Sequence, residues 1–338
     1  LVIRLLQLSK ACVQLFTRPL SILHGTLELD FRQLCGARSL LELSQILLQS
    51  VVTLLEIHGL EHFTHYYTDY GIDLQRRFLG HFLKGEDTGW GEQPKVQLLI
   101  RHPDEVFVER AEDAWPIPRT EWTEMYLDPA GKTLSDAPMA DAQSFTYEAM
   151  GDGATFLAPP VAQETEITGP VAAKLFISSE TEDADLFLVL RVFKPDMKEV
   201  VYKGANDPHT PVGLGWLRAS HRKLDPDQTL PYRPYHAHDE VQPLTPGEIY
   251  ELDIEIWPTS IVLPEGYRLG LSVRGRDYVY PGWTPGDPMI ANRVQYGVGP
   301  FKHEMPSNRP LDVYGKKVTL HTGPDHPSHV LLPVIPEK

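Results

Sequence analysis

The chain has 338 residues, of which 42% are hydrophobic, so it is large enough for two folded domains or one large one. Its formal net charge of -15 at pH 7 argues against a nucleic-acid partner, because binding to phosphates depends on Lys and Arg. The two cysteines, Cys12 and Cys35, cannot supply a disulfide framework. No stretch is apolar enough to span a membrane and no signal peptide is recognisable, so we expect a cytoplasmic protein with no membrane partner.

Residues 1–50 are rich in leucine and have helical spacing in places. A helix is predicted after Ser39, because the following apolar residues would form one broad face. These residues are Leu40, Leu41, Leu43, Ile46, Leu47 and Val51. No function follows from this segment, which we treat as uncertain, either diverged or derived from a misread gene sequence.

Residues 51–92 have a clearer pattern. A short strand is predicted over residues 53–57, and a helix starts near Asp69 or Asp73 and ends at Gly85. Strand, loop and helix in this order form the unit from which α/β sheets are built, and reactive residues often lie where the strand passes into the loop. The predicted helix has one apolar side, formed by Ile72, Phe78, Leu79, Phe82 and Leu83.

Three histidines, His58, His62 and His65, occupy the loop after this strand. They can be ordinary polar loop residues. They can also be metal ligands, since residues 58–62 read H-x-x-E-H, but that zinc motif requires a helix and Gly59 directly follows a strand-like run. The third interpretation is a general base, held after a strand so that it takes a proton from a nucleophile. We favour the base and expect no metal or other cofactor.

After Trp90 the chain is rich in proline and consists of short alternating runs, which is typical of an antiparallel β-sandwich. The run DLFLVLRVF, residues 185–193, is almost continuously apolar, as expected for a strand buried on both faces. With eight or more strands, the pattern predicts a two-sheet jelly roll. The other predicted strands are residues 96–101, 171–177, 200–203, 250–257, 267–273, 317–321 and 330–335.

Three clusters in this half suggest ligand sites but have simpler interpretations. The first, His236, His238 and Asp239, is interpreted as a surface cluster because a metal needs three or four convergent ligands. The second lacks the glycine loop of calcium motifs and is interpreted as a solvated turn. It comprises Glu180, Glu182, Asp183 and Asp185. The third is aromatic and suggests a carbohydrate surface, although aromatic residues more often fill sandwich cores. It comprises Trp216, Tyr232, Tyr235, Tyr278, Tyr280 and Trp283.

Several stretches resemble the CocE/NonD hydrolases, the group of X-Pro dipeptidyl-peptidases and cocaine-esterase-like acyl hydrolases. The resemblance covers residues 54–336 and begins with HFLKG at residues 81–85. It continues through AWPIPRTEW, TGPVAAKLFISS, GWLRASHRKLDP, LTPGEIYELDIEIWPTS and HPSHVLLPVI. The resemblance implies a mainly β chain, with a C-terminal jelly-roll β-sandwich over residues 93–338 and the tail of an α/β-hydrolase domain over residues 51–92.

The resemblance also implies a serine hydrolase that cleaves an ester or amide bond of a small-molecule ester or a peptide through an acyl-enzyme. His62 would be the general base and Asp30, 32 residues earlier, the acidic member of the triad. The chain contains no G-x-S-x-G nucleophile motif, so we expect the C-terminal part of a longer enzyme. The alternatives are a jelly-roll module that binds a carbohydrate or a protein, and a non-functional gene fragment. Assembly into a homo-oligomer stays open.

Overall fold

The computed structural model describes residues 54–59, 64–204, 209–281 and 302–336. All of them belong to one compact unit, Leu54–Lys338, and the remaining unit is Leu1–Thr53. The predicted helix after Ser39, the candidate acid Asp30 and the candidate base His62 therefore lie outside the described residues.

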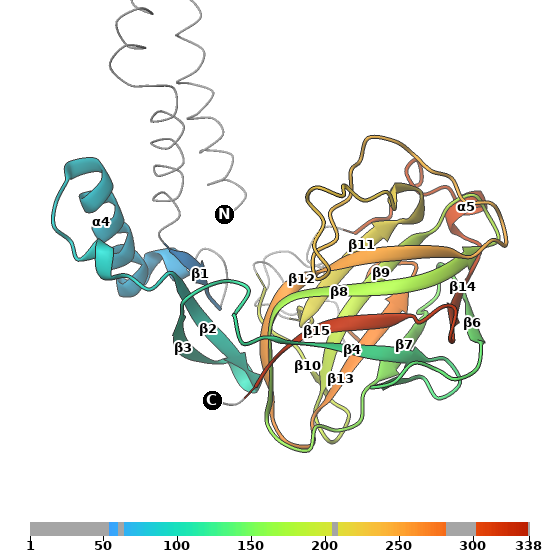
Figure 1. Ribbon diagram of the computed structural model, residues 1–338, viewed down its shortest axis with the longest axis horizontal. Coiled ribbons are helices and arrows are strands. Elements are labelled where there is room, and N and C mark those ends of the chain that lie inside the picture. Colours follow the sequence, from blue (N-terminus) through green and yellow to red (C-terminus); the bar gives the residue numbers. More distant parts are fainter. Residues whose placement is uncertain (1–53, 60–63, 205–208, 282–301, 337–338) are drawn as a thin grey trace, which may run out of the picture. The chain divides into compact units, whose positions relative to one another are not determined.

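The described chain begins with the strand, loop and helix that the sequence predicts (Figure 1). Strand β1 (Leu55–Ile57) is followed by the short 3-10 helix η2 (Thr64–Tyr67) and helix α4 (Asp69–Lys84). β1 pairs in parallel with β2 (Val96–His102), and β2 pairs antiparallel with β3 (Val106–Glu112). A helix that links two parallel strands is the crossover of an α/β fold. Two further 3-10 turns are η3 (Trp90–Glu92) and η4 (Pro103–Glu105).

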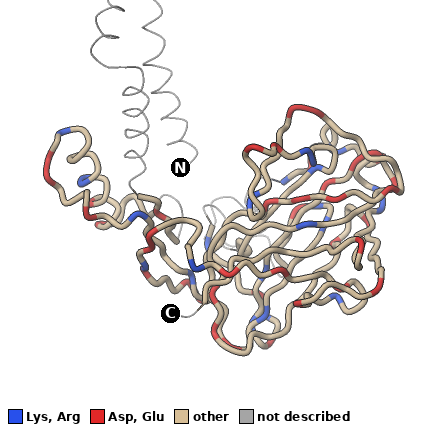
Figure 2. Tube along the Cα trace, in the orientation of Figure 1, with Lys and Arg blue, Asp and Glu red and all other residues tan. Residues whose placement is uncertain are grey.

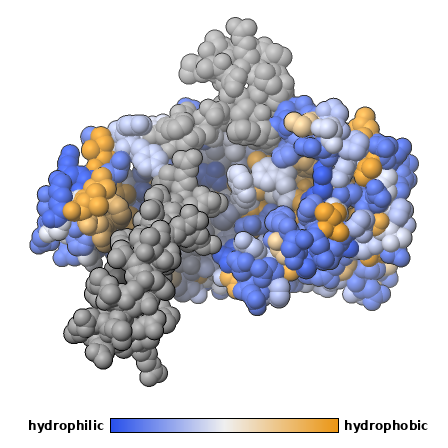
Figure 3. Space-filling view, turned by 90° about the horizontal axis from the view of Figure 1, so that it is seen from above, coloured by the Kyte–Doolittle hydropathy of each residue, from blue (hydrophilic) through white to orange (hydrophobic). Residues whose placement is uncertain are grey.

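Helix α4 begins and ends at clear capping residues. The side chain of Thr68 accepts a hydrogen bond from the amide of Gly71 at 3.1 Å, and Gly85 adopts the left-handed conformation at φ 67°. Most of its apolar side is exposed, and Figure 3 shows the corresponding orange area at the left. Leu83 is 76% exposed and Phe82 42%. The described residues therefore leave this face largely uncovered.

The rest of the chain forms a β-sandwich, which confirms the predicted fold class. Strand pairing follows the order β12-β11-β9-β13-β7-β5-β4-β15-β8, and β8 also pairs with β12, so the pairing closes on itself. These strands are β4 (Glu121–Asp128), β5 (Thr133–Ser135), β7 (Ala154–Leu157), β8 (Thr165–Ser179), β9 (Asp185–Phe193), β11 (Gly213–Arg218), β12 (Tyr250–Leu263), β13 (Arg268–Arg274) and β15 (His329–Ile335). Attached to them are β6 (Gln143–Glu148), β10 (Glu199–Val200), β14 (Lys317–Thr322), η5 (Ala219–His221) and α5 (Leu311–Tyr314).

Strand β9 lies at the centre of the sandwich, as its apolar run predicts. Leu186, Leu188 and Leu190 point into the main core, where none of them is exposed. On the opposite face Phe187 and Val189 are buried as well, since the chain after β13 and the strand β11 provide a second cover. Both faces of the strand are therefore buried, as a continuous apolar run requires.

Prolines mark the places where the long strands bend. β12 continues beyond its predicted end at Trp257, because a shift in pairing between Ile256 and Thr259 accommodates Pro258. The pairing of β15 with β8 shifts in the same way around Pro333, and a side chain at Gly169 would lie 2.7 Å from that proline. The bends of β8 and β12 are visible at the left of the sandwich in Figure 1.

The small sheet is attached to the sandwich by an apolar cluster and by ion pairs. Arg110 makes a two-point contact with Glu166 at 2.6 Å, and Arg119 makes another with Glu112 at 2.7 Å. The apolar cluster contains Val96, Leu98, Ile100, Ile117, Val262 and Ile335.

The interpretation of the acidic cluster as a solvated turn is wrong for two of its members. Asp183 is buried and accepts hydrogen bonds from Ser220, through its amide at 2.9 Å and its hydroxyl at 2.7 Å, and from Tyr314 at 2.8 Å. Asp185 is also buried, between Arg218 and Arg309. These partners come from distant parts of the sequence, so local composition could not reveal the burial. The other two members, Glu180 and Glu182, are exposed.

Candidate functional site

The candidate site is built on the side of β1 that faces away from the apolar cluster. Leu55 and Ile57 pack against the cluster of the small sheet. Because successive side chains of a strand point to opposite sides, Glu56 and the following His58 share the other side. The end of β1 therefore presents a carboxylate and an imidazole together.

His65, from η2, completes this group. Its Nε2 donates a hydrogen bond to Oε1 of Glu56 at 2.6 Å, and its ring stacks on that of His58 at 4.2 Å with an interplanar angle of 8°. His58 donates from Nδ1 to the carbonyl of Gly59 at 2.9 Å, which leaves its Nε2 without a proton in this tautomer. We call Glu56, His58 and His65 the histidine stack.

The histidine stack is tied to the start of α4. The hydroxyl of Thr68, which caps the helix, donates to the carbonyl of His65 at 2.8 Å. Tyr70, in the first turn of the helix, lies 5.3 Å from the His65 ring. Burial, together with the nearby carboxylate of Glu56, raises the pKa of Tyr70 to about 12, so its phenol stays protonated.

The general base predicted from the sequence, His62, lies between His58 and His65 in the chain. Residues 60–63, which include His62, lie outside the described residues. His58 lies in non-helical backbone directly after β1, so the helix that an H-x-x-E-H zinc motif requires does not include its first histidine. Within the described ranges, no three His, Cys, Asp or Glu side chains are grouped to hold a metal ion.

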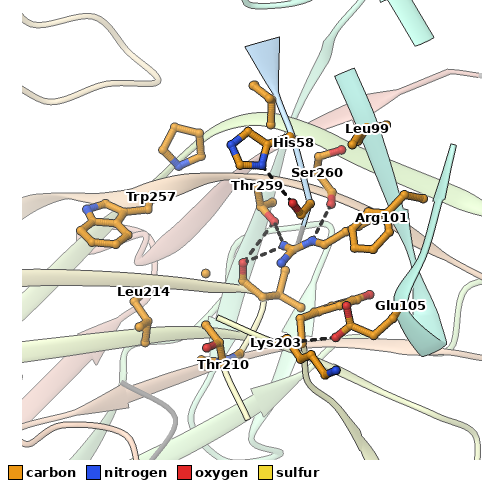
Figure 4. Close-up of a pocket in the computed structure, with 18 of the residues that line it drawn as sticks. His58, Leu99, Arg101, Glu105, Lys203, Thr210, Leu214, Trp257, Thr259 and Ser260 are labelled. Carbon is orange, nitrogen blue, oxygen red and sulfur yellow. Dashed lines mark hydrogen bonds between the residues drawn. The ribbon is translucent and has the colours of Figure 1, made fainter. Parts of the chain in front are cut away.

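A pocket of about 260 Å³ begins beside His58 and Gly59 (Figure 4). It lies between the small sheet and β12, and Figure 4 labels His58, Arg101 and Trp257 among its lining residues. Gly59 is needed there because the ring of Phe107 lies against the backbone: a Cβ atom would be 1.9 Å from it. The pocket is lined further by Leu99, Arg101, Glu105, Trp115, Tyr202, Leu214, Thr259 and Ser260, among others.

Arg101 lies in the middle of this pocket and holds two elements together. Its guanidinium donates to the carbonyl of Ser260 at 3.1 Å and to the hydroxyl of Thr259 at 3.0 Å, both on β12. It also donates to the carbonyl of Val212 at 3.2 Å and lies 4.3 Å from the ring centre of Tyr202. Burial lowers the pKa of Arg101, and the hydrogen bonds described above all go to neutral oxygens. Its evident role is to fasten β2 to the sandwich.

Glu105 supplies an open acceptor at the edge of the same pocket. Its Oε1 accepts a hydrogen bond from the amide of Lys203 at 2.7 Å. Its Oε2 is buried and has no hydrogen-bond partner among the described residues. Asp104 and Glu105 both have positive φ, 65° and 59°, so the turn that presents this carboxylate is strained. A ligand with a hydrogen-bond donor would satisfy Oε2.

The cluster of His236, His238 and Asp239 does not form a metal site. His236 donates from Nε2 to the carbonyl of Asp253 at 3.0 Å, and burial lowers its pKa, which favours the neutral ring. The ring of His238 is 6.1 Å away, and Asp239 pairs with Lys223 at 2.9 Å. Each member therefore has a role within the protein.

The aromatic set does not form one surface. Tyr278 is buried and donates its hydroxyl proton to Glu199 at 2.7 Å, whereas Tyr280 stacks on His209 at 4.4 Å. Tyr232 stacks on Trp122 at 4.6 Å, and Trp216 pairs with Trp257. Tyr235 is exposed, and Trp283 lies outside the described residues. The described members of the set are therefore spread over separate contacts, as expected for aromatic residues that fill a sandwich core and its interfaces.

Charge is distributed without a basic face on the side of the molecule that Figure 2 shows, where acidic and basic residues alternate along the strands. In the part of the chain that the structure describes, no helix has the length and apolar character needed to cross a membrane.

The chain is similar to several known hydrolases. Cocaine esterase of Rhodococcus sp. is 24% identical over 302 residues, which are 78% of this chain and 45% of that protein. A Mycobacterium bovis protein, provisionally named a serine esterase, is 29% identical over 249 residues, or 62% of this chain and 37% of that protein. The chain thus spans less than half the length of these relatives.

The fold is similar to that of a solved relative. The crystal structure of a CocE/NonD family hydrolase from Staphylococcus aureus superimposes with a TM-score of 0.73 at 25% identity, over 84% of this chain and 49% of that one. Residues 88–331 match the family described as the X-Pro dipeptidyl-peptidase C-terminal non-catalytic domain. Since this match spans well over half of the chain, the chain belongs to that family and corresponds to the C-terminal part of a CocE/NonD hydrolase.

Proposed function

We propose that the chain works as the C-terminal part of a serine hydrolase of the X-Pro dipeptidyl-peptidase or acyl esterase type. Such an enzyme cleaves an amide or ester bond through an acyl-enzyme. Its serine is supplied from outside these 338 residues, which contain no G-x-S-x-G motif. The proposal is supported by relatives named as an esterase and as a CocE/NonD hydrolase, of which the chain covers 45% and 49%.

The observation that carries the proposal is the histidine stack at the end of β1. It fixes both ends of the short loop that contains His62, because His58 lies before the loop and His65 after it. Fixed flanking residues suit a general base, whose ring must be held within hydrogen-bond distance of the nucleophile. In this role His62 takes the proton of the serine and returns it to the leaving group, and Asp30 orients the ring.

The pocket beside His58 would accept part of the substrate. Its walls include the apolar side chains of Trp115, Leu214 and Trp257, and its polar feature is the open Oε2 of Glu105. An apolar cleft with one or two polar groups is typical of sites for small molecules. The sandwich would thus shape the pocket while the chemistry takes place on the hydrolase side. The substrate is a small-molecule ester or a peptide.

The uncovered parts of the small unit fit the same proposal. Among the described strands β1 pairs only with β2, so its other edge is available to a further strand. The apolar face of α4 is exposed next to it. The remainder of an α/β-hydrolase domain would extend the sheet at β1 and cover the helix.

A chimaera tests this proposal directly. The hydrolase part of the Staphylococcus aureus relative would be fused before residue 54, and the product treated with a fluorophosphonate probe and assayed with an aryl ester. We expect labelling and turnover in the chimaera. His62→Ala should lower kcat by roughly 1,000-fold or more, the size of effect seen when a triad member is removed. His81→Ala, on α4, is the matched control and should leave kcat within about twofold.

Two results would contradict the proposal. If a serine of the 338-residue chain itself reacts with the probe, the nucleophile lies inside the chain. If the folded chimaera, verified by circular dichroism, keeps its activity in His62→Ala but loses it in His58→Ala or His65→Ala, the base is a member of the stack.

A further inference from the structure

A second cavity, of about 700 Å³, lies on the outer face of the sandwich over β9, β11 and β12. In this region Gly215 on β11 pairs with Ile256 on β12, whose side chain lies in the core. The neighbouring pair in this antiparallel register is Trp216 and Glu255, on the opposite side of the two strands. Trp257 follows two residues after Glu255 and lies on the same side of β12. Gly215 is required for this approach, because a Cβ atom there would be 2.5 Å from the carbonyl oxygen of Glu255.

The two tryptophans form a corner around the carboxylate. Their ring centres are 5.2 Å apart and their planes meet at 72°, so each ring stands nearly upright against the other. Trp257 is 62% exposed, although its strand β12 has a neighbour on each side, β11 and β8. All three side chains line the cavity. We call Trp216, Glu255 and Trp257 the tryptophan corner.

Glu255 differs from the acidic residues beside it on the same side of β12. Glu251 and Asp253 share the ammonium group of Lys174, which lies 2.9 Å from Asp253. Glu255 has neither an ion pair nor a side-chain hydrogen bond with any described residue. Its surroundings are partly dry, and this burial raises its pKa. A half-buried carboxylate that no ion pair or side-chain hydrogen bond compensates is costly, and a positively charged ligand would reduce that cost.

The cations in the same cavity already have partners. Arg218 and Arg309 both bind Asp185, at 2.8 Å, and Lys302 lies 2.6 Å from Glu304. The positive charge of Arg233 lowers the pKa of Glu255, but this effect is weaker than that of burial. The negative charge at the tryptophan corner is therefore not neutralised by the described lining.

We propose that the tryptophan corner binds a small organic ammonium ion, such as a quaternary or methylated amine. Indole faces attract such cations through their electron-rich rings, and a carboxylate adds direct charge attraction. A metal ion is a poorer match because Glu255 is a single ligand. A sugar would stack on Trp257 but would leave the charge of Glu255 unpaired. The site belongs to the sandwich, and its occupation does not depend on the proposed hydrolase activity.

The test uses the 338-residue chain, choline as the cation, and 3,3-dimethylbutan-1-ol as a neutral molecule of the same shape. Binding is followed by tryptophan fluorescence and by calorimetry. We expect choline to bind at least roughly tenfold more tightly than the neutral alcohol. Glu255→Gln should remove most of this preference, and Trp257→Leu should weaken choline binding by a similar factor. Glu251→Gln, on the same side of β12 but paired with Lys174, should bind choline as the unchanged chain does.

Circular dichroism spectra and melting temperatures of all variants show whether each one is folded. Equal affinity for choline and the neutral alcohol would overturn the proposal, as would unchanged choline binding in a folded Glu255→Gln. Methyl β-glucoside serves as a further probe: if it binds at the corner and choline does not, the site recognises sugars and the proposal is wrong.

Discussion

The sandwich and the β1–α4 segment both contain regular apolar patterns, with opposite results. In the sandwich, residues of β9 are buried on both faces, and the internal carboxylates of Asp183 and Asp185 are fully hydrogen-bonded. In α4, Leu83 and Phe82 lie on a regular apolar face that described residues leave exposed. The comparison teaches that an amphipathic pattern shows which face is meant for burial but does not identify its partner. The strands of the sandwich cover one another, whereas the described residues leave the apolar face of α4 largely uncovered.

The largest expected loss of stability comes from the ion network of the sandwich. Asp185→Ala would leave Arg309, whose side chain is only 7% exposed, without its carboxylate partner. We expect the free energy of unfolding to fall by about 3–5 kcal/mol. Urea denaturation followed by circular dichroism measures it. Glu148→Ala, which removes an exposed pair with Lys317, is the control and should cost about 0–1 kcal/mol.

Two leucine variants, one in the buried strand β9 and one on the exposed face of α4, test whether the two regions differ in packing. Leu188→Ala, in the fully buried part of β9, should cost about 2–5 kcal/mol because it leaves a cavity. Leu83→Ala, on the exposed face of α4, should change stability by no more than about 0.5 kcal/mol in this chain. In the chimaera with a hydrolase domain, the cost of Leu83→Ala should rise. If Leu83→Ala is as costly as Leu188→Ala in the 338-residue chain, the face of α4 is already packed and the comparison fails.

A smaller and more local effect is expected at the start of α4. Thr68→Ala removes the hydroxyl that accepts from the amide of Gly71 and donates to the carbonyl of His65. A lost cap of this kind costs about 1 kcal/mol. Hydrogen exchange should become faster for amides in α4 and stay unchanged in β9. Thr68→Ser keeps the hydroxyl and should behave as the unchanged chain; faster exchange throughout the sandwich would mean that the two regions unfold together.

The smallest effect is a pH dependence located in the sandwich. Burial lowers the pKa of His321 from 6.5, and the neighbouring His326 lowers it further. The unfolded chain therefore takes up a proton at higher pH than the folded one, so this contribution is present above about pH 6.5 and is lost as the pH falls below it. Unfolding in urea at about pH 7.5 and about pH 5.5 should show a smaller pH effect in His321→Gln. An unchanged pH effect in that variant would assign the effect to other groups.

How well the fold could be predicted depended on whether the signal was local. The continuous apolar run of β9 indicates a buried strand by itself, and the observed bounds of the strand match the predicted ones. Strand β11, GLGWLR, was missed because its two glycines look like turn residues, although they permit a close approach to the neighbouring strand. β12 was cut short at Trp257, since Pro258 resembles a strand end until the pairing shift around it is known.

In the candidate site, too, only the features with a local signal in the sequence could be predicted. The three histidines were visible as neighbours in the sequence, but the contact between Glu56 and His65 was not predicted. One signal was available: alternation along β1 puts Glu56 on the side of His58. The tryptophan corner and the Asp185 network depend on the register between distant strands, which no local pattern contains.

The position of the last strand determines when the molecule can fold. β15, residues His329–Ile335, lies between β4 and β8 and pairs with both. The ring of strands is therefore incomplete until β15 has been made and has paired with both strands. Contacts over such long separations form slowly, and until then β4 and β8 have open edges. By pairing with both strands, β15 covers edges that would otherwise be open to pairing with neighbouring molecules.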